Sequence, residues 1–211
     1  MEDYIIDPHK IESESFQQIR RLSNLEGFDA NEQQVAMRII HTCGMPEIVE
    51  HIRFSDQAVN AGLKAIRKKA TILCDVNMVK CSLTQRMLYT DPLCFINKAK
   101  VVSQAKTKGK TRSMLAVDEW ANKIENSIVI IGNAPTALFR LLERLESDFR
   151  KPALVIAMPV GFIGAAESKA TLWKNYQRLG IECMTLEGTQ GGSAIAASAM
   201  NALLRIVQEL E

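Results

Sequence analysis

The segment MPVGFIGAAESK, residues 158–169, joins a predicted strand to a predicted helix. The apolar run over 152–158 is typical of a buried strand, and a helical pattern follows from about Ala165. Between them, Gly161 and Gly164 permit a tight turn. Such a turn leaves backbone N–H groups free at the carboxyl edge of a sheet, where anionic ligands bind.

Two further segments repeat this arrangement of strand, glycine and helix. They are VIIGNAPTALF (129–139) and MTLEGTQGGSAIAASAMNAL (184–203). Three such turns in one chain indicate a ligand with several anionic groups. The alternative is an ordinary α/β protein that turns its corners with glycine.

From Thr71 onward, predicted strands alternate with predicted helices. The strands are expected at 71–76, 95–100, 127–131, 153–158 and 181–186, and the helices at 78–88, 113–125, 135–147, 165–179 and 192–210. This alternation predicts a three-layer α/β/α fold around a doubly wound, mostly parallel sheet of about five strands. We expect residues 1–211 to form a single domain.

Helices are also predicted before the sheet. Asp7 followed by Pro8 is a helix start, and this first helix should end near Gly27. A second helix is expected over about 31–43, with Gly44 as its stop, and a third over 55–69.

The composition excludes several classes of protein. The chain has 211 residues and a formal net charge of +2, so overall basicity does not indicate binding to nucleic acid. Its N-terminus lacks the pattern of a signal peptide, and its longest apolar stretch, 152–166, is broken by proline and glycine. Its five cysteines form no C-x-x-C pair, which favours reduced thiols. We therefore expect a cytoplasmic protein that does not enter the membrane.

His41 is the strongest candidate for chemistry among the three histidines. It lies in the last turn of its predicted helix, where the helix dipole favours a protonated imidazole. Arg38 precedes it by three residues and shares its helical face, so a common anionic ligand would explain the pair. A metal site from His41, Cys43 and His51 is disfavoured, because no second cluster of ligands supports it.

Other catalytic motifs do not occur. The chain contains no G-x-S-x-G elbow, no G-x-G-x-x-G fingerprint and no G-x-x-x-x-G-K-[ST] loop. One further feature is a basic stretch over 98–112 with six lysines and arginines and no acid. Gly109 and nearby threonines predict a mobile loop there, either simply solvated or acting as a flap over a polyanionic ligand.

Taken together, these segments resemble the precorrin-8X methylmutase (precorrin isomerase) family of cobalamin biosynthesis. PVGFIGAAESK and the helix end containing Arg38, His41, Cys43 and Gly44 carry most of the resemblance. The matching segments are IESESFQQIRR (11–21), VAMRIIHTCGM (35–45), ILCDVNMV (72–79), KTRS (110–113), VIIGNAPTALFRLLE (129–143), PVGFIGAAESK (159–169) and GGSAIAASAMNAL (191–203).

The resemblance implies a reaction in which a methyl group moves from carbon 11 to carbon 12 of a tetrapyrrole. The substrate is precorrin-8X or cobalt-precorrin-8, and the product hydrogenobyrinic or cobyrinic acid. Such a shift needs positioning and acid catalysis but no metal and no cofactor. By the same resemblance, His41 is the proton donor, and Ser15 and Arg38 bind the substrate.

Further contacts with this polycarboxylate substrate follow from the same comparison. Arg112 is expected to bind a carboxylate, while Glu167 and Lys169 are read as a structural pair. The remaining expected contacts are Thr136, Gly161, Gly191 and Gly192, with the backbone of 132–134, 161–164 and 189–193. The chain departs from the family at Lys80-Cys81, where many relatives have glycine, and at 187–190, where relatives are often basic.

The family also implies a homodimer with active sites at the subunit boundary. Two other functions stay open at this stage. One is a carrier that binds a tetrapyrrole without converting it, and the other is a nucleotide-using α/β enzyme.

Overall fold

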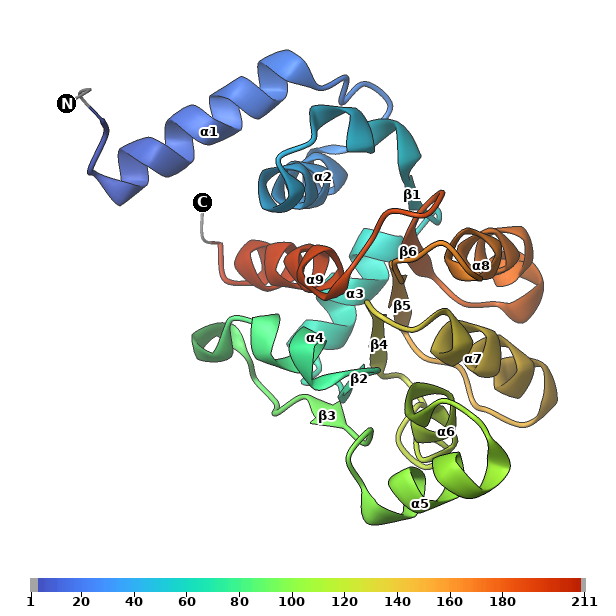
Figure 1. The fold of residues 1–211 in the computed structure, drawn as a ribbon. Coiled ribbons are helices and arrows are strands. Elements are labelled where there is room, and N and C mark those ends of the chain that lie inside the picture. The colour runs from blue at the N-terminus through green and yellow to red at the C-terminus, as the bar shows by residue number, and fades with distance from the viewer. Residues whose placement is uncertain (1–3, 210–211) are drawn as a thin grey trace.

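The computed structural model describes residues 4–209 and contains one mixed sheet (Figure 1). In these residues, six strands lie in the order β1-β6-β5-β4-β2-β3, with β1 antiparallel to β6 and the others parallel. The bounds are β1 (Ile52–Phe54), β2 (Ile72–Cys74), β3 (Leu93–Cys94), β4 (Ile128–Ile131), β5 (Leu154–Ala157) and β6 (Cys183–Leu186). The predicted α/β class is confirmed.

Two helical layers cover the sheet, and side chains alternate between them. Ile128 and Ile130 of β4 enter the core under α2, α3, α4 and α9, whereas Val129 and Ile131 enter the core under α5 to α8. The first layer consists of α2 (Ala30–Cys43), α3 (Ala58–Arg67), α4 (Asn77–Ser82) and α9 (Ser193–Val207), with 3₁₀ turns at Pro46–His51 and Gln85–Met87. The second consists of α5 (Ala99–Lys108), α6 (Arg112–Asp118), α7 (Pro135–Ser147) and α8 (Ala165–Leu179). No helix in the described residues is long and apolar enough to cross a membrane.

The N-terminal helix α1 (Pro8–Leu22) packs on α2 at the outside of the first layer (Figure 1). The Asp7 carboxylate accepts hydrogen bonds from the N–H groups of His9 and Lys10, so the predicted start is confirmed. The helix ends at Leu22, earlier than the predicted end near Gly27. At the end of α2, Gly44 adopts the left-handed conformation with φ of 69°, as predicted.

Two predictions about the sheet were wrong in detail. The prediction of about five strands missed β1, which pairs Ile52 with Leu186 and Phe54 with Met184. A strand was expected over 95–100, but β3 covers only Leu93–Cys94. Short strands at the edges of the sheet form through pairing with a neighbour, which local patterns do not reveal.

The prediction of a mobile loop over 98–112 was wrong. Most of this stretch is helix α5, which buries Val101 and Ala105 one turn apart, ends at Lys108 and is capped by Gly109. Glu119 holds the start of α5 through ion pairs with Lys98 at 3.3 Å and Lys100 at 2.8 Å. The predicted helix 113–125 is also shorter, because α6 ends at Asp118.

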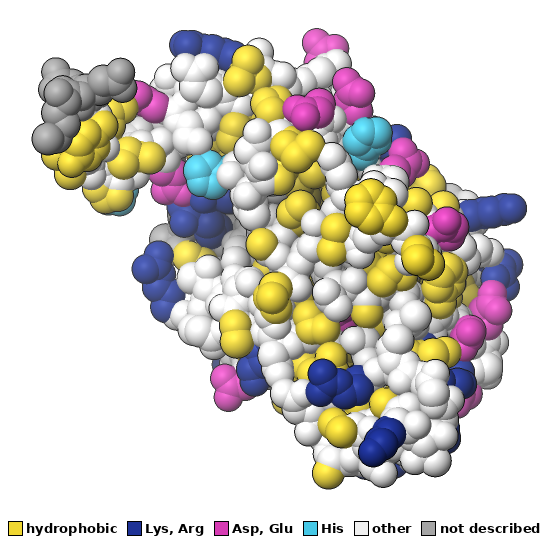
Figure 2. Space-filling model, in the orientation of Figure 1, with side chains coloured by type: hydrophobic (Ala, Val, Ile, Leu, Met, Phe, Trp, Pro, Cys, Tyr) yellow, Lys and Arg dark blue, Asp and Glu magenta, His cyan; other side chains and the backbone are white. Residues whose placement is uncertain are grey.

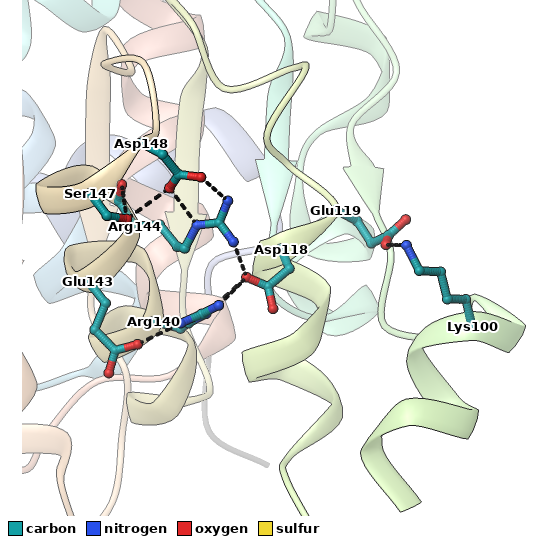
Figure 3. A network of polar contacts seen from close by, with 8 residues as sticks. All are labelled: Lys100, Asp118, Glu119, Arg140, Glu143, Arg144, Ser147 and Asp148. Carbon is teal, nitrogen blue, oxygen red and sulfur yellow. Dashed lines mark hydrogen bonds and ion pairs between the residues drawn. The ribbon is translucent and has the colours of Figure 1, made fainter. Parts of the chain in front are cut away.

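A network of ion pairs joins α6 to α7 (Figure 3). From α7, Arg140 reaches Asp118 at 2.8 Å and Arg144 reaches the same oxygen at 3.0 Å. The guanidinium of Arg144 also lies over the ring of Phe149. These contacts fix α6 against α7 and so fix their N-termini, which lie at the carboxyl edge of the sheet.

The strand order places a switch point between β2 and β4. The chain passes from β2 outward to β3, returns to β4 on the other side of β2, and continues through β5 to β6. In open α/β sheets, ligands bind outside the carboxyl ends of the strands near such a point. The turns after β2, β4, β5 and β6 therefore form the edge at which a site is expected.

Candidate functional site

Ser15 and His41 meet between α1 and α2. The Ser15 hydroxyl lies 2.9 Å from Nδ1 of His41, and the ring of His41 stacks on Phe16 with 5.4 Å between centroids. His41 is exposed and lies in the last turn of α2. A serine on one ring nitrogen and an aromatic ring on one face orient the imidazole, and Nε2 has no hydrogen-bond partner among residues 4–209.

Arg38 lies on the same face of α2, as the spacing predicts. Its guanidinium carbon is 4.4 Å from the centroid of the Phe16 ring, so Phe16 contacts both Arg38 and His41. Cations over an aromatic face are attracted by its quadrupole. The structure therefore brings Ser15, Arg38 and His41 together around Phe16.

Glu12 is the acidic partner of this cluster. Its carboxylate accepts from Arg38 Nη1 at 2.5 Å and lies 3.5 Å from Arg205 Nη2 of α9. Burial acts to raise the pKa of Glu12, but the nearby guanidiniums outweigh it and lower that pKa. Arg38 is thus already engaged at one nitrogen and keeps further N–H donors for another anion.

A hollow of about 790 Å³ opens beside this cluster, between α1, α2 and the end of α9. Phe16, Met37 and Arg38 line it, together with Arg20 and Arg205. Its lining combines apolar and uncharged polar side chains with three guanidiniums. Figure 2 shows that histidine side chains reach the surface of the face in view.

The turn after β4 lies at the switch point and is closed by Asp75, which follows β2. Both oxygens of this buried carboxylate accept backbone N–H groups: Gly132 at 3.2 Å, Asn133 at 3.0 Å and Ala134 at 2.9 Å. Burial raises the pKa of Asp75, and these N–H groups oppose the shift because they stabilise the carboxylate. The backbone of 132–134, predicted to contact the substrate, thus donates these N–H groups to the protein's own carboxylate.

The turns after β5 and β6 are bonded to each other. Gly161 N–H donates to the Thr189 carbonyl at 3.1 Å, and Gly192 N–H donates to the Met158 carbonyl at 2.8 Å. A Cβ on Gly191 would lie 2.2 Å from the Met158 carbonyl oxygen, so only glycine fits this close approach. The structure brings Gly161, Gly191 and Gly192 together, as predicted from their shared edge.

Lys169 is not the structural partner of Glu167 that the sequence suggested. Its side chain is buried and donates to the Gln190 carbonyl, whereas Glu167 is exposed. Burial lowers the pKa of Lys169 to about 8. This lysine was missed as a functional candidate, because its partner lies 21 residues away.

Arg112 and Thr136 form a third group of predicted substrate contacts, at the starts of α6 and α7. The Thr136 hydroxyl lies 2.7 Å from that of Thr111, the N-cap of α6, and Arg112 donates to Asn97 at 3.3 Å. Arg112 is exposed. These groups neighbour one another, but among the described residues no hydrogen bond or ion pair links them to His41.

One contact comes close to joining the His41 cluster to the turns after β5 and β6. The Gln190 side-chain amide is 4.0 Å from Sδ of Met45, which follows the helix that carries His41. The segment 187–190 is therefore close to the end of α2. Glu187 in that segment pairs with Arg53 at 2.6 Å.

Neither a metal centre nor a thiol nucleophile emerges from the described residues. No three His, Cys, Asp or Glu side chains in this part of the chain lie close enough to hold a metal ion. Burial raises the pKa of the Cys43 thiol near His41, which makes it a poor nucleophile. The polar groups that remain suit binding of anions and delivery of a proton.

Comparison with known proteins identifies the family. A family model described as Precorrin-8X methylmutase matches residues 10–206. A precorrin-8X methylmutase of Pseudomonas aeruginosa is 45% identical over 96% of this chain and 98% of its own length. A cobalt-precorrin-8 methylmutase of Leptospira interrogans is 34% identical over 92% of this chain and 91% of its own.

Solved structures agree with the sequence comparison. The crystal structure of precorrin-8X methylmutase from Thermus thermophilus matches with a TM-score of 0.86 and 34% identity, over 96% of this chain and 98% of that one. These relatives are 34% to 45% identical to this chain and cover more than 90% of it. The chain belongs to the precorrin-8X methylmutase family and is an enzyme of the isomerase class.

Proposed function

We propose that this enzyme acts in cobalamin biosynthesis and moves a methyl group from carbon 11 to carbon 12 of precorrin-8X or cobalt-precorrin-8. The product would be hydrogenobyrinic or cobyrinic acid. The observation that carries the proposal is the exposed imidazole of His41, held by Ser15 at 2.9 Å and by the ring of Phe16.

The geometry around His41 supports a role as proton donor. When the Ser15 hydroxyl donates to Nδ1, a neutral imidazole carries its hydrogen on Nε2, which is the nitrogen left open. A protonated ring also presents an Nε2–H group, with the Ser15 oxygen as acceptor. In both forms, Nε2–H can donate a hydrogen bond to the ring that receives the methyl group, and the protonated form can also transfer its proton to that ring.

The positive groups around this imidazole suit a substrate with several carboxylates. Arg38 would bind one carboxylate with the N–H groups that Glu12 leaves open, and Arg112 would bind another from the start of α6. Phe16 offers an aromatic face to a flat macrocycle. Thr136 and the glycine turns would complete the contacts.

We also propose that the chain acts as a homodimer. Large apolar side chains are exposed at several places in the described residues. Among them are the tip formed by Phe162 and Ile163, which are 95% and 91% exposed, and helix α1 with Ile11 and Leu22. Figure 2 shows hydrophobic side chains across the face in view. Such patches mark interfaces or ligand sites, and sedimentation equilibrium would measure the mass.

Replacement of His41 by alanine tests the proposed chemistry. His41→Ala should bind hydrogenobyrinic acid with nearly wild-type affinity but convert precorrin-8 at least about 100-fold more slowly, because the proton donor is lost. The measurement is the change in absorption spectrum of precorrin-8 and of cobalt-precorrin-8 with pure protein.

His51→Ala is the matched control, since His51 also lies in a last helical turn and is exposed. It should retain wild-type turnover. A wild-type protein that binds the substrate but never changes its spectrum would instead support a carrier. Unaltered turnover in His41→Ala would remove His41 from the mechanism.

A further inference from the structure

The buried ammonium of Lys169 has no carboxylate partner. Its residue is 1% exposed, and no ion pair to it forms in the described part of the chain. Its hydrogen bond goes to the Gln190 carbonyl. Buried lysines are normally paired with an acid, because desolvating an ammonium is costly. A lysine kept in this position therefore requires a reason other than stability.

The carbonyl that Lys169 holds belongs to the peptide between Gln190 and Gly191. No described peptide bond is cis, so the N–H of this peptide points away from its carbonyl and hence away from Lys169. The ammonium aligns the peptide and polarises it toward a stronger N–H donor. Gly191 N–H has no acceptor among residues 4–209.

The surroundings fix this peptide firmly. Hydrogen bonds of the two adjoining turns, from Gly161 to Thr189 and from Gly192 to Met158, bracket it on both sides. Contact with Met158 leaves no room for a side chain at Gly191. On the other side, Gln190 approaches Met45 at the end of the helix that carries His41.

We propose that Lys169 is a positioning residue of the substrate site, holding the Gln190–Gly191 peptide so that the Gly191 N–H binds a carboxylate of the tetrapyrrole. This inference rests on the proposed function, because it takes the tetrapyrrole as the ligand. Residues 187–192 contain no basic side chain, and Lys169 supplies this segment with a cation from helix α8. The charge acts through the peptide and does not touch the ligand.

The test compares Lys169→Met with Lys174→Met, which removes an exposed lysine from the same helix. For each variant, absorbance titration with hydrogenobyrinic acid gives Kd, turnover of precorrin-8 gives KM and kcat, and thermal unfolding gives Tm. Lys169→Met should raise Kd and KM about tenfold, the size expected for a lost charge-assisted hydrogen bond, with kcat within about twofold. Lys174→Met should match the wild type.

The stability readout separates positioning from a merely structural role. Lys169→Met removes a desolvated charge, so its Tm should equal or exceed that of the wild type while its binding weakens. A lowered Tm with unchanged Kd would overturn the proposal, as would wild-type Kd and KM. If Lys169→Met does not fold, Lys169→Gln keeps a donor without the charge, and a folded Lys169→Gln with wild-type Kd would also overturn it.

The same data distinguish failure of the isomerase proposal from failure of this one. If the wild-type protein binds hydrogenobyrinic acid but does not convert precorrin-8, the isomerase proposal fails. The ratio of Kd between Lys169→Met and the wild type then still decides the role of Lys169. A wild-type protein with no affinity for this corrinoid would overturn both.

Discussion

Two turns at the carboxyl edge of the sheet have the same form and opposite electrostatics. After β4, the turn 132–134 donates three N–H groups to the buried carboxylate of Asp75. After β6, the turn 188–192 accepts a hydrogen bond from the buried ammonium of Lys169. The first turn is closed by an internal anion, whereas the second has an internal cation behind it and an N–H group to spare.

The difference shows that a glycine turn between a strand and a helix is not by itself an anion site. Both turns follow buried strands and precede helices, so a local pattern treats them alike. A single buried side chain, distant in sequence, decides whether the N–H groups are used within the protein or offered to a ligand. The turn at the switch point is therefore the less suitable of the two for a substrate carboxylate.

Removal of the Asp75 carboxylate should have the largest effect on stability. Asp75→Ala leaves the N–H groups of Gly132, Asn133 and Ala134 buried without their acceptor, and we expect the free energy of unfolding to fall by about 3–5 kcal/mol. Urea denaturation measures this change. Asp75→Asn, which keeps one acceptor oxygen, should fall between Asp75→Ala and the wild type.

A loss below about 1 kcal/mol in Asp75→Ala would break the comparison, because it would mean that water replaces the carboxylate easily. The turn after β4 would then be open to ligands as well. Circular dichroism of both variants checks that the fold persists before unfolding.

The buried ammonium predicts a dependence of stability on pH. Burial lowers the pKa of Lys169 from 10.5 to about 8, so between these values the unfolded chain binds a proton that the folded chain does not. The free energy of unfolding therefore rises with pH across this window, by about 3 kcal/mol in total. Below pH 8 the full cost of burying the charged ammonium lowers the stability of the folded protein.

Denaturation of the wild type and Lys169→Met at pH 7.5 and pH 10 isolates this contribution, since other groups titrate equally in both proteins. The wild type should gain stability over this range relative to Lys169→Met. An equal change in the two proteins would show that the ammonium is better solvated than its burial indicates, which would weaken the contrast with Asp75.

The fold could be predicted where local chemistry determines it. Asp7 before Pro8 and Gly44 after Cys43 mark helix ends that the structure confirms, because caps depend on neighbouring residues. Strand β1 could not be predicted, since its three residues are fixed by pairing with β6, which lies 130 to 134 positions later in the chain. In the 98–112 segment, the lysines concealed the buried pair Val101 and Ala105 that makes α5 a helix.

The candidate site also has parts that the sequence predicts and parts that depend on distant partners. The shared face of Arg38 and His41 follows from helical spacing, and Ser15 came from the resemblance to the family. Phe16 and Glu12 were missed, although they lie on the α1 face that contacts α2, one residue after and three before Ser15. Asp75 and Lys169 had no local signal, because their partners lie 57 and 21 residues away in the chain.

The smallest effect on stability is expected from an exposed cation. It sharpens the contrast with the buried charges of Asp75 and Lys169. The Lys100 side chain is 64% exposed and paired with Glu119 at 2.8 Å, so Lys100→Met should leave the free energy of unfolding measurably unchanged. Its KM for precorrin-8 should also equal that of the wild type, because Glu119 already engages this ammonium and α5 is a packed helix. Arg112→Met is the contrasting variant, since an exposed guanidinium at the start of α6 should raise KM if it binds a carboxylate. A raised KM in Lys100→Met, strongest at low salt, would show that α5 leaves Glu119 to bind the substrate, and the flap, one of the two alternatives that the lysines suggested, would then operate from a helix.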